Sequence, residues 1–207
     1  GQLDARMDRV AAALQRDGLK ATDAIAICAA SSNDYMAVFA GALRAGVAVA
    51  PLAPSCTAAQ LRDMMTDADA RFLFTDAATL QTLRDGGIDI ASLPRVLRLD
   101  EGIEPWLAPA GAKPQPVTID PAWAFNLIYS SGTTGTPKGI VQPHAMRWVH
   151  IQRANLTGYG PDCVTLIATP LYSNTTLVAV IPTLAVGGQV VLLPKFEATA
   201  YLELAQT

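Results

Sequence analysis

The amino-acid sequence predicts an α/β fold in which a mostly parallel sheet is flanked by helices on both faces. Apolar runs of strand length alternate with stretches of helical periodicity, and short polar segments join them, which is typical of a parallel sheet with crossover helices. The strand-like runs are apolar at almost every position, as strands covered on both faces require. The chain has 207 residues, 51% of them hydrophobic and 16% charged, enough for one sizeable core or for one domain and part of another.

The first helix is predicted over residues 3–16. Leu3, Val10 and Leu14 lie on one side at helical spacing, and Gly18 follows where a helix would end. Further along the chain, Thr57 and Gln60 form the pattern of a capping box, which predicts that a helix begins there. By the same reasoning, the first hundred residues contain predicted strands at 24–28, 47–51, 71–75 and 95–99, and predicted helices at 33–45, 57–67 and 77–84.

Five prolines between residues 100 and 121 predict an irregular connection rather than a helix or strand. Beyond it, strands are expected at 123–129, 140–142, 164–168 and 189–193, and helices at 144–156, 175–185 and from 198 onward. Residues 163–194 carry no charge. Polar residues, glycines and a proline divide this stretch, so a buried strand, helix and strand are predicted instead of a membrane span.

Charge and cysteine content narrow the function classes. The formal net charge of −3, without a run of Lys or Arg, gives no reason to expect nucleic acid or an anionic membrane as a partner. The N-terminal residues do not match a signal peptide. The three cysteines lack a metal-binding spacing and the two histidines are six positions apart, so the sequence predicts no metal site and favours a reducing cytoplasm.

The segment from Tyr129 to Gly139 carries the chemistry. After Tyr129 it contains five hydroxyl side chains, three glycines and Lys138, and it lies between two predicted strands. Glycines let a ligand approach the backbone closely, and successive N–H groups in such a turn can hold an anion. Hydroxyl groups add donors and Lys138 adds a positive charge. Together these features predict a site for a polyphosphate.

Two simpler interpretations of this segment exist, a flexible linker and one of the common nucleotide-binding motifs. Composition alone would fit a flexible linker rich in Ser, Thr and Gly. The Walker A pattern fails because Pro137 stands where a glycine is required, and the dinucleotide pattern G-x-G-x-x-G is absent from the loop.

The order of residues resembles the signature loop of the adenylate-forming superfamily, which includes acyl- and aryl-CoA synthetases and the adenylation domains of peptide synthetases. Every position of Ser/Thr-Ser/Thr-Gly-Ser/Thr-Thr-Gly-x-Pro-Lys-Gly is met. Residues 3–14, 23–27 and 42–52 also resemble family segments, and His144 stands where many members carry a histidine. The resemblance implies the N-terminal subdomain of an acetyl-CoA-synthetase-like fold. It also implies ATP-phosphate contacts from Ser130, Ser131, Gly132, Thr133, Thr134, Gly135 and Lys138.

The implied reaction joins a carboxylic acid to the α-phosphate of Mg-ATP and then transfers the acyl group to a thiol. The co-substrate is expected to be coenzyme A, with a carrier protein as the alternative acceptor. Tyr172, Ser173 and Asn174 are the acyl-pocket candidates. Ser173 replaces a histidine found in many CoA ligases, which would widen the pocket or admit a polar acyl group, unless Ser173 simply caps the next helix. The acid itself, fatty or aryl, stays open.

The family's Tyr-Gly-x-Thr-Glu segment, whose Glu binds Mg²⁺, has no match in this sequence, because Tyr159 and Gly160 are followed by Pro161 and Asp162. The family's catalytic lysine lies in a small C-terminal domain that also has no match here. Residues 1–207 are therefore expected to be the N-terminal portion of the large AMP-binding domain, with no catalytic residue of their own and no activity alone. A catalytically inert phosphate-binding fragment is the third interpretation.

Overall fold

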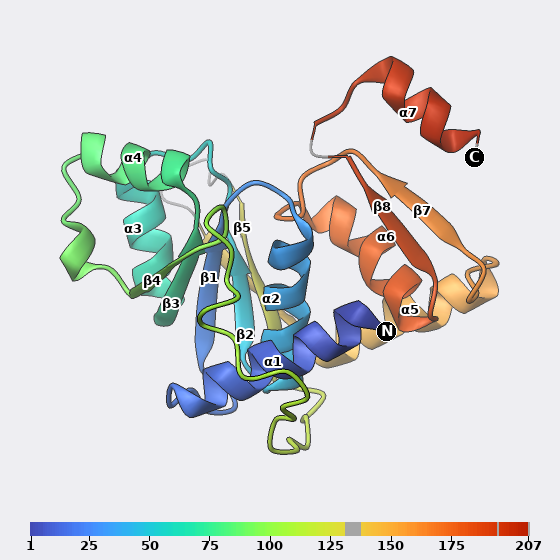
Figure 1. The fold of residues 1–207 in the computed structure, drawn as a ribbon, viewed down its shortest axis with the longest axis horizontal. Helices are drawn as coiled ribbons and strands as arrows, with labels where there is room; N and C mark the ends of the chain where they lie inside the picture. The colour runs from blue at the N-terminus through green and yellow to red at the C-terminus, as the bar shows by residue number, and fades with distance from the viewer. Residues whose placement is uncertain (131–137, 194, 207) are drawn as a thin grey trace.

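A computed structural model describes residues 1–130, 138–193 and 195–206 of the protein (Figure 1). The described strands are β1 (Ala24–Cys28), β2 (Ala48–Pro51), β3 (Ala70–Thr75), β4 (Arg95–Arg98), β5 (Ala124–Ser130), β6 (Lys138–Pro143), β7 (Val164–Ile167) and β8 (Gln189–Leu192). The helices are α1 (Gln2–Arg16), α2 (Asn33–Arg44), α3 (Ala58–Asp67), α4 (Ala77–Asp85), α5 (His144–Leu156), α6 (Asn174–Ala185) and α7 (Ala198–Ala205), with a 3₁₀ turn at Ile90–Ser92.

Six strands form the main sheet in the order β4-β3-β1-β2-β5-β6, in which only β6 runs antiparallel to its neighbour. The strands β7 and β8 form a separate parallel pair, connected through α6. The prediction of a mostly parallel sheet with helices on both faces is confirmed. The sequence did not reveal that the last strands leave this sheet, because strand pairing depends on contacts between distant segments.

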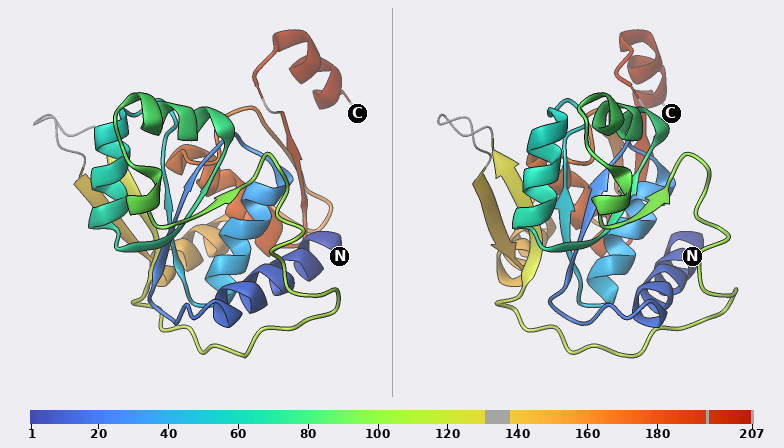
Figure 2. Two further views of the ribbon diagram at one scale, coloured as in Figure 1. Left: turned by 60° about the vertical axis from the view of Figure 1, so that its left-hand side comes forward. Right: turned by 90° about the vertical axis from the view of Figure 1, so that its left-hand side faces the viewer.

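The alternation of side chains along β1 divides the core into two layers. Ile25 and Ile27 pack on the face that carries α1 and α2, whereas Ala26 and Cys28 pack with α3 and α4 on the other face. The two views in Figure 2 show these helix pairs on opposite sides of the sheet. Strand β1 can be apolar on both faces because helices cover both of them.

Most predicted elements lie within one or two residues of their observed bounds. The capping box at the start of α3 has both of its hydrogen bonds, and Gly18 and Gly46 adopt φ values of 89° and 74° just after α1 and α2. The strand β6 is longer than the predicted 140–142. The uncharged stretch forms β7, α6 and β8 as predicted, and no described helix combines the length and apolar character needed to cross a membrane.

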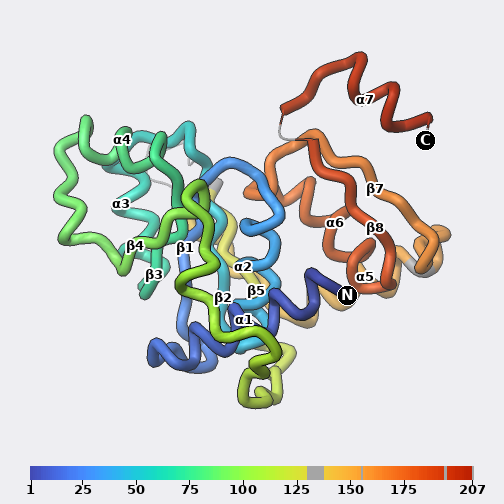
Figure 3. Tube along the Cα trace, viewed as in Figure 1, coloured from blue at the N-terminus to red at the C-terminus, as the bar shows by residue number. Residues whose placement is uncertain are grey.

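The irregular connection between β4 and β5 runs along the α1 side of the molecule (Figure 3). Arg9 Nε donates to the Ala108 carbonyl at 2.7 Å, and Trp106 Nε1 donates to Asp17 Oδ2 at 2.7 Å. Asp8 of α1, only 5% exposed, accepts from Lys113 of this connection and from Arg44 of α2. One buried carboxylate thus joins three segments that are far apart in the sequence.

Asp8→Asn is expected to lower the free energy of unfolding by about 1–3 kcal/mol, because it leaves two cations without their shared buried anion. Lys113 first, and then Arg44, hold the pKa of Asp8 below its usual value against the effect of burial. The stabilisation is therefore complete above the unfolded pKa of about 3.9 and is lost as pH falls toward the lower native pKa. Urea unfolding at pH 7 and at pH 3 measures both effects.

The matched control is Asp63→Asn. Asp63 pairs with Arg62 at the surface, where both side chains are about half exposed, so the loss should stay below about 1 kcal/mol. Equal losses for the two variants would contradict the role assigned to Asp8.

Candidate functional site

The hairpin of β5 and β6 presents both ends of the phosphate-loop segment. Ser130 at the end of β5 pairs in register with Lys138 at the start of β6. Residues 131–137 lie outside the described part of the chain, and with them the candidates Ser131, Gly132, Thr133, Thr134 and Gly135. The two described ends are held opposite each other by the antiparallel ladder.

These ends lie at the carboxyl edge of the parallel strands, because β5 runs parallel to β2. In open α/β sheets this edge is where ligands bind. The Lys138 side chain is exposed, and no described carboxylate lies within ion-pair distance of it. Its charge is therefore available to an anionic ligand.

Tyr129 fastens the hairpin to α3. Its hydroxyl lies 2.7 Å from Asp67 Oδ2 and 3.1 Å from the Met64 carbonyl. Burial, together with the carboxylate of Asp67, raises the pKa of Tyr129, so the hydroxyl stays protonated and donates. The facing residue is Gly139, where an added Cβ would lie 2.9 Å from Asp67 Oδ2 and 3.1 Å from the Tyr129 ring. The sequence pattern did not reveal this contact with α3.

Tyr129→Phe is expected to lower the free energy of unfolding by about 1–2 kcal/mol, because it removes a hydrogen bond to a charged acceptor. Urea unfolding provides the measurement. Tyr159→Phe is the control, since no hydrogen bond of the Tyr159 hydroxyl is recorded within the described residues. A loss that is no larger at Tyr129 than at Tyr159 would argue against this role.

A cleft of about 310 Å³ opens beside the acyl-pocket candidate Tyr172. Its walls come from segments that follow β1, β2 and β7, at their carboxyl ends: residues 29–31, Pro54 and residues 168–170. Ser31 Oγ accepts from the Leu171 amide at 2.9 Å and so holds the Tyr172 segment against the β1–α2 loop. Lys195 also lines the cleft.

The other two acyl-pocket candidates do not line this cleft. Ser173 occupies the N-cap position of α6, but its side chain makes no capping hydrogen bond, so helix capping does not explain the serine. Asn174 Oδ1 instead accepts from Arg147 Nη2 at 2.8 Å. No sequence pattern predicted a role for Ser31, Lys195 or Arg147. The first two follow strands, where polar residues in α/β proteins commonly meet ligands.

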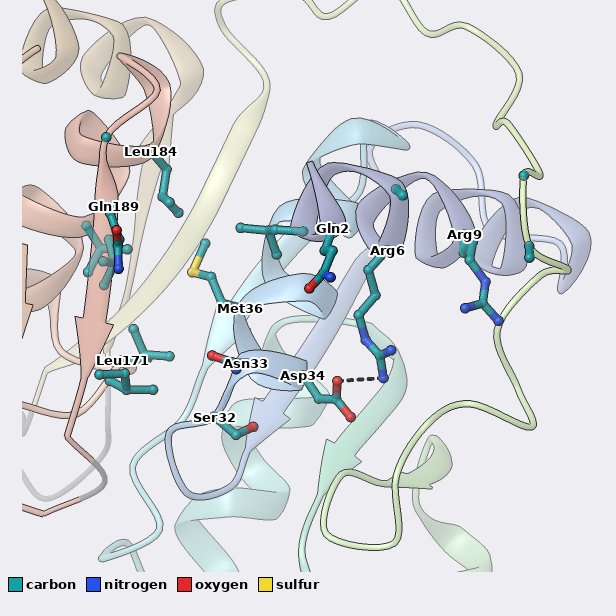
Figure 4. A pocket seen from close by; sticks show the side chains of 18 residues that line it. Gln2, Arg6, Arg9, Ser32, Asn33, Asp34, Met36, Leu171, Leu184 and Gln189 are labelled. Atoms are coloured by element: carbon teal, nitrogen blue, oxygen red, sulfur yellow. Dashed lines mark ion pairs between the residues drawn. The ribbon is translucent and has the colours of Figure 1, made fainter. Parts of the chain in front are cut away.

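A larger cleft of about 890 Å³ lies between the α1–α2 pair and the α6–β8 segment (Figure 4). Its charged groups are already paired: Arg6 with Asp34 at 2.7 Å, and Arg6 and Arg9 with Glu104. Lys138, the phosphate candidate whose side chain the structure describes, does not line it. Volume alone therefore does not make it the reaction site.

His144 begins α5 and its ring meets the edge of Phe125 at 5.0 Å between centroids. Burial lowers the pKa of this imidazole, so it is neutral at pH 7. Within the described ranges, no three His, Cys, Asp or Glu side chains come together in a way that could hold a metal ion.

The family model described as AMP-binding enzyme matches residues 1–207. The chain belongs to the AMP-binding enzyme family. This AMP-binding chain is 31% identical over 194 residues to sulfoacetate–CoA ligase from Cupriavidus necator, covering 89% of this chain and 37% of the relative. It is 29% identical over 181 residues to a 4-hydroxybenzoate–CoA/benzoate–CoA ligase from Rhodopseudomonas palustris, covering 83% of this chain and 33% of the relative.

A third relative transfers its product to a protein, according to its name. It is the L-proline–[L-prolyl-carrier protein] ligase of Streptomyces coelicolor, 31% identical over 157 residues, covering 70% of this chain and 29% of the relative. Among solved structures, the N-terminal domain of FACL13 from Mycobacterium tuberculosis superposes with a TM-score of 0.87 at 22% identity, covering 98% of this chain and 52% of that one. This likeness shows the fold. The AMP-binding chain spans about a third of the length of these curated relatives.

Proposed function

We propose that the protein containing this chain activates a carboxylic acid with ATP. A carboxylate oxygen attacks the α-phosphorus, the bond to the bridging oxygen of pyrophosphate breaks, and an acyl-adenylate forms. The thiol sulfur of coenzyme A then attacks the acyl carbon, AMP leaves, and the thiol proton passes to a base. The observation that carries the proposal is the complete signature pattern at residues 130–139, whose described ends lie at the carboxyl edge of an AMP-binding chain's sheet.

In this reaction the chain's part is to position the ATP phosphates. Backbone amides and hydroxyl groups of the loop donate to phosphate oxygens, and Lys138 places a positive charge beside them, which stabilises charge that develops on the departing pyrophosphate. The proposed contacts are Ser130, Ser131, Gly132, Thr133, Thr134, Gly135 and Lys138.

Adenylate-forming CoA ligases use ATP, Mg²⁺ and coenzyme A. Within the described ranges, no group of carboxylates or histidines comes together in a way suited to a metal. We assign the carboxylate ligand of Mg²⁺ to another part of the protein.

The acid is proposed to bind beside Tyr172, in the cleft of about 310 Å³ at the carboxyl ends of β1 and β7. Its walls combine alanine and proline with the hydroxyl groups of Ser31 and Thr169. Lys195 lines the same cleft and adds a positive charge. This mixture suits a small acid with both apolar and polar parts.

The deciding experiment is carboxylate-dependent exchange of labelled pyrophosphate into ATP. The protein containing the chain should exchange with at least one acid from a panel of aliphatic, aryl and charged carboxylates. The isolated 207-residue chain should not, because we propose that it forms only the N-terminal portion of the domain. Exchange by the isolated chain would overturn that second statement, and silence of the whole protein with every acid would overturn the first.

A second function is transfer of the acyl group to a carrier protein, which the similarity to the prolyl-carrier protein ligase favours. Thioester formation distinguishes the two: coenzyme A accepts the acyl group under the first proposal, and a phosphopantetheine-bearing carrier protein under the second.

We also propose a cytoplasmic location, in keeping with three free cysteines, and no nucleic-acid partner, in keeping with the net charge of −3.

A further inference from the structure

Arg147 is a buried cation without a described anionic partner. It lies on α5 and is only 1% exposed. Its guanidinium donates to Asn126 Oδ1 from Nε at 3.2 Å and from Nη2 at 3.0 Å, and to Gln142 Oε1 and Asn174 Oδ1 from Nη2. All of these acceptors are neutral amides, and no described carboxylate forms an ion pair with Arg147. A buried charge normally requires an opposite charge.

The donors around Arg147 are unevenly used. Nη2 has two hydrogens and faces three amide oxygens, whereas the buried Nη1 has no partner within the described structure. The buried Nδ2 of Asn126 likewise has none. Asn126 is 0% exposed. Two buried donors, one of them charged, are thus left without an acceptor on two residues that are hydrogen-bonded to each other.

A purely structural role explains part of this arrangement. Arg147 links β5, β6 and the first residue of α6 through its amide partners, and it lies over the Phe125 ring at 5.7 Å. A structural link does not require a charge, however, and it leaves Nη1 and Asn126 Nδ2 unexplained. Burial lowers the pKa of Arg147 to about 10, so the guanidinium remains charged at neutral pH.

Arg147 is connected through Asn174 to the segment that lines the proposed acid cleft. Its partner Asn174 is two residues after Tyr172, which lines the cleft of about 310 Å³. Because Nη2 has one acceptor more than it has hydrogens, the Asn174 oxygen can leave it without exposing an unpaired hydrogen. Arg147 is therefore hydrogen-bonded to a residue that lies two positions from the wall of this cleft.

We propose that Arg147 binds a second anionic group of the substrate, so that the preferred acid carries a carboxylate or sulfonate in addition to the carboxylate that is activated. Nη1 and Asn126 Nδ2 donate to this group, which supplies the missing negative charge. Guanidinium suits such planar, charge-assisted recognition. The inference rests on the proposed function and names its substrate class.

The test compares matched pairs of acids in pyrophosphate exchange by the whole protein: succinate with butanoate, glutarate with pentanoate, and terephthalate with 4-methylbenzoate. In at least one pair, kcat/KM should be at least about 10-fold higher for the diacid. Arg147→Met should lower kcat/KM for the diacid by about 10- to 100-fold, because it removes charge-assisted hydrogen bonds. The value for the matched monocarboxylic acid should change by less than about threefold. Arg153→Met, an exposed arginine on the same helix, is the control.

The inference is overturned if the monocarboxylic acid has the higher kcat/KM in every pair, or if the preference for the diacid survives Arg147→Met. Thermal unfolding shows whether Arg147→Met folds. If Arg147→Met does not fold, Arg147→Lys retains the charge and should keep the preference for the diacid at a raised KM. A preference of the wild type for the monocarboxylic acid in every pair overturns the inference without any variant. Calorimetric titration with the same pairs separates the failures, since Arg147-dependent diacid binding without exchange overturns only the proposed function.

Discussion

Lys138→Ala in the protein that contains this chain is expected to lower kcat/KM for ATP by about 100- to 1,000-fold, which is typical for the loss of one donor aimed at developing charge. Lys138 is the only cation in the loop segment of residues 129–139. It stands at the start of β6, where the ladder with β5 fixes its backbone, and its side chain is exposed. The KM for the carboxylic acid should change little, because the acid is proposed to bind beside Tyr172. Steady-state exchange with each substrate varied in turn measures both values.

Two variants control for charge and for surface lysines in general. Lys138→Arg keeps the charge and should recover part of the ATP dependence, although a guanidinium cannot replace an ammonium group in every geometry. Lys20→Ala removes an exposed lysine near the start of β1, away from the carboxyl edge, and should leave exchange unchanged. Equal KM and kcat for ATP in wild type and Lys138→Ala would rule out the phosphate role.

Gly41→Ala is expected to lower the free energy of unfolding by about 2 kcal/mol, within the usual range for overpacking a core. Gly41 lies within α2, where helix propensity alone favours alanine by about 1 kcal/mol. An added Cβ would lie 2.6 Å from Val10 Cβ and 3.0 Å from the Met7 carbonyl oxygen. Both atoms belong to or adjoin the backbone of α1, so no side-chain rotation relieves the clash. Urea unfolding of the chain measures whether Gly41→Ala lowers or raises the free energy of unfolding.

A double-mutant cycle isolates the contact. Val10→Gly removes the side chain that the added methyl of Gly41→Ala would contact. The double variant should therefore lose less unfolding free energy than the sum of the two single losses, by at least about 1 kcal/mol. Additive losses, or a stabilising Gly41→Ala, would mean that α1 moves away freely and that close packing of the two helices is not what this glycine provides.

Local features were predictable because the information that determines them lies within a few residues. The capping box of Thr57 and Gln60 has both predicted hydrogen bonds, and Gly18 and Gly46 end their helices with positive φ. Strand β1 was predictable because it is apolar on every residue. The short 3₁₀ turn at Ile90–Ser92 was missed, since three residues give no periodicity to detect.

The candidate site also has one part that the sequence predicted and one part that it did not. An uninterrupted pattern of loop residues identified the family and predicted a phosphate-binding segment, because the chemistry of phosphate binding resides in contiguous backbone and hydroxyl groups. The cleft beside Tyr172 could not be predicted. Its walls come from residues 29–31, 54, 168–170 and 195–196, and only tertiary packing brings these segments together.

The sequence by itself determined the family, the alternation of strands and helices, and the segment that we propose binds the ATP phosphates. Only the tertiary structure decided which side chains lack room or a partner. Gly41 is a weak helix residue in the sequence and a close contact with α1 in the fold. Arg147 has the spacing of an ordinary helix residue, yet it is buried among amides from two strands and a second helix. The physical reason is that space and charge compensation depend on neighbours that are distant along the chain.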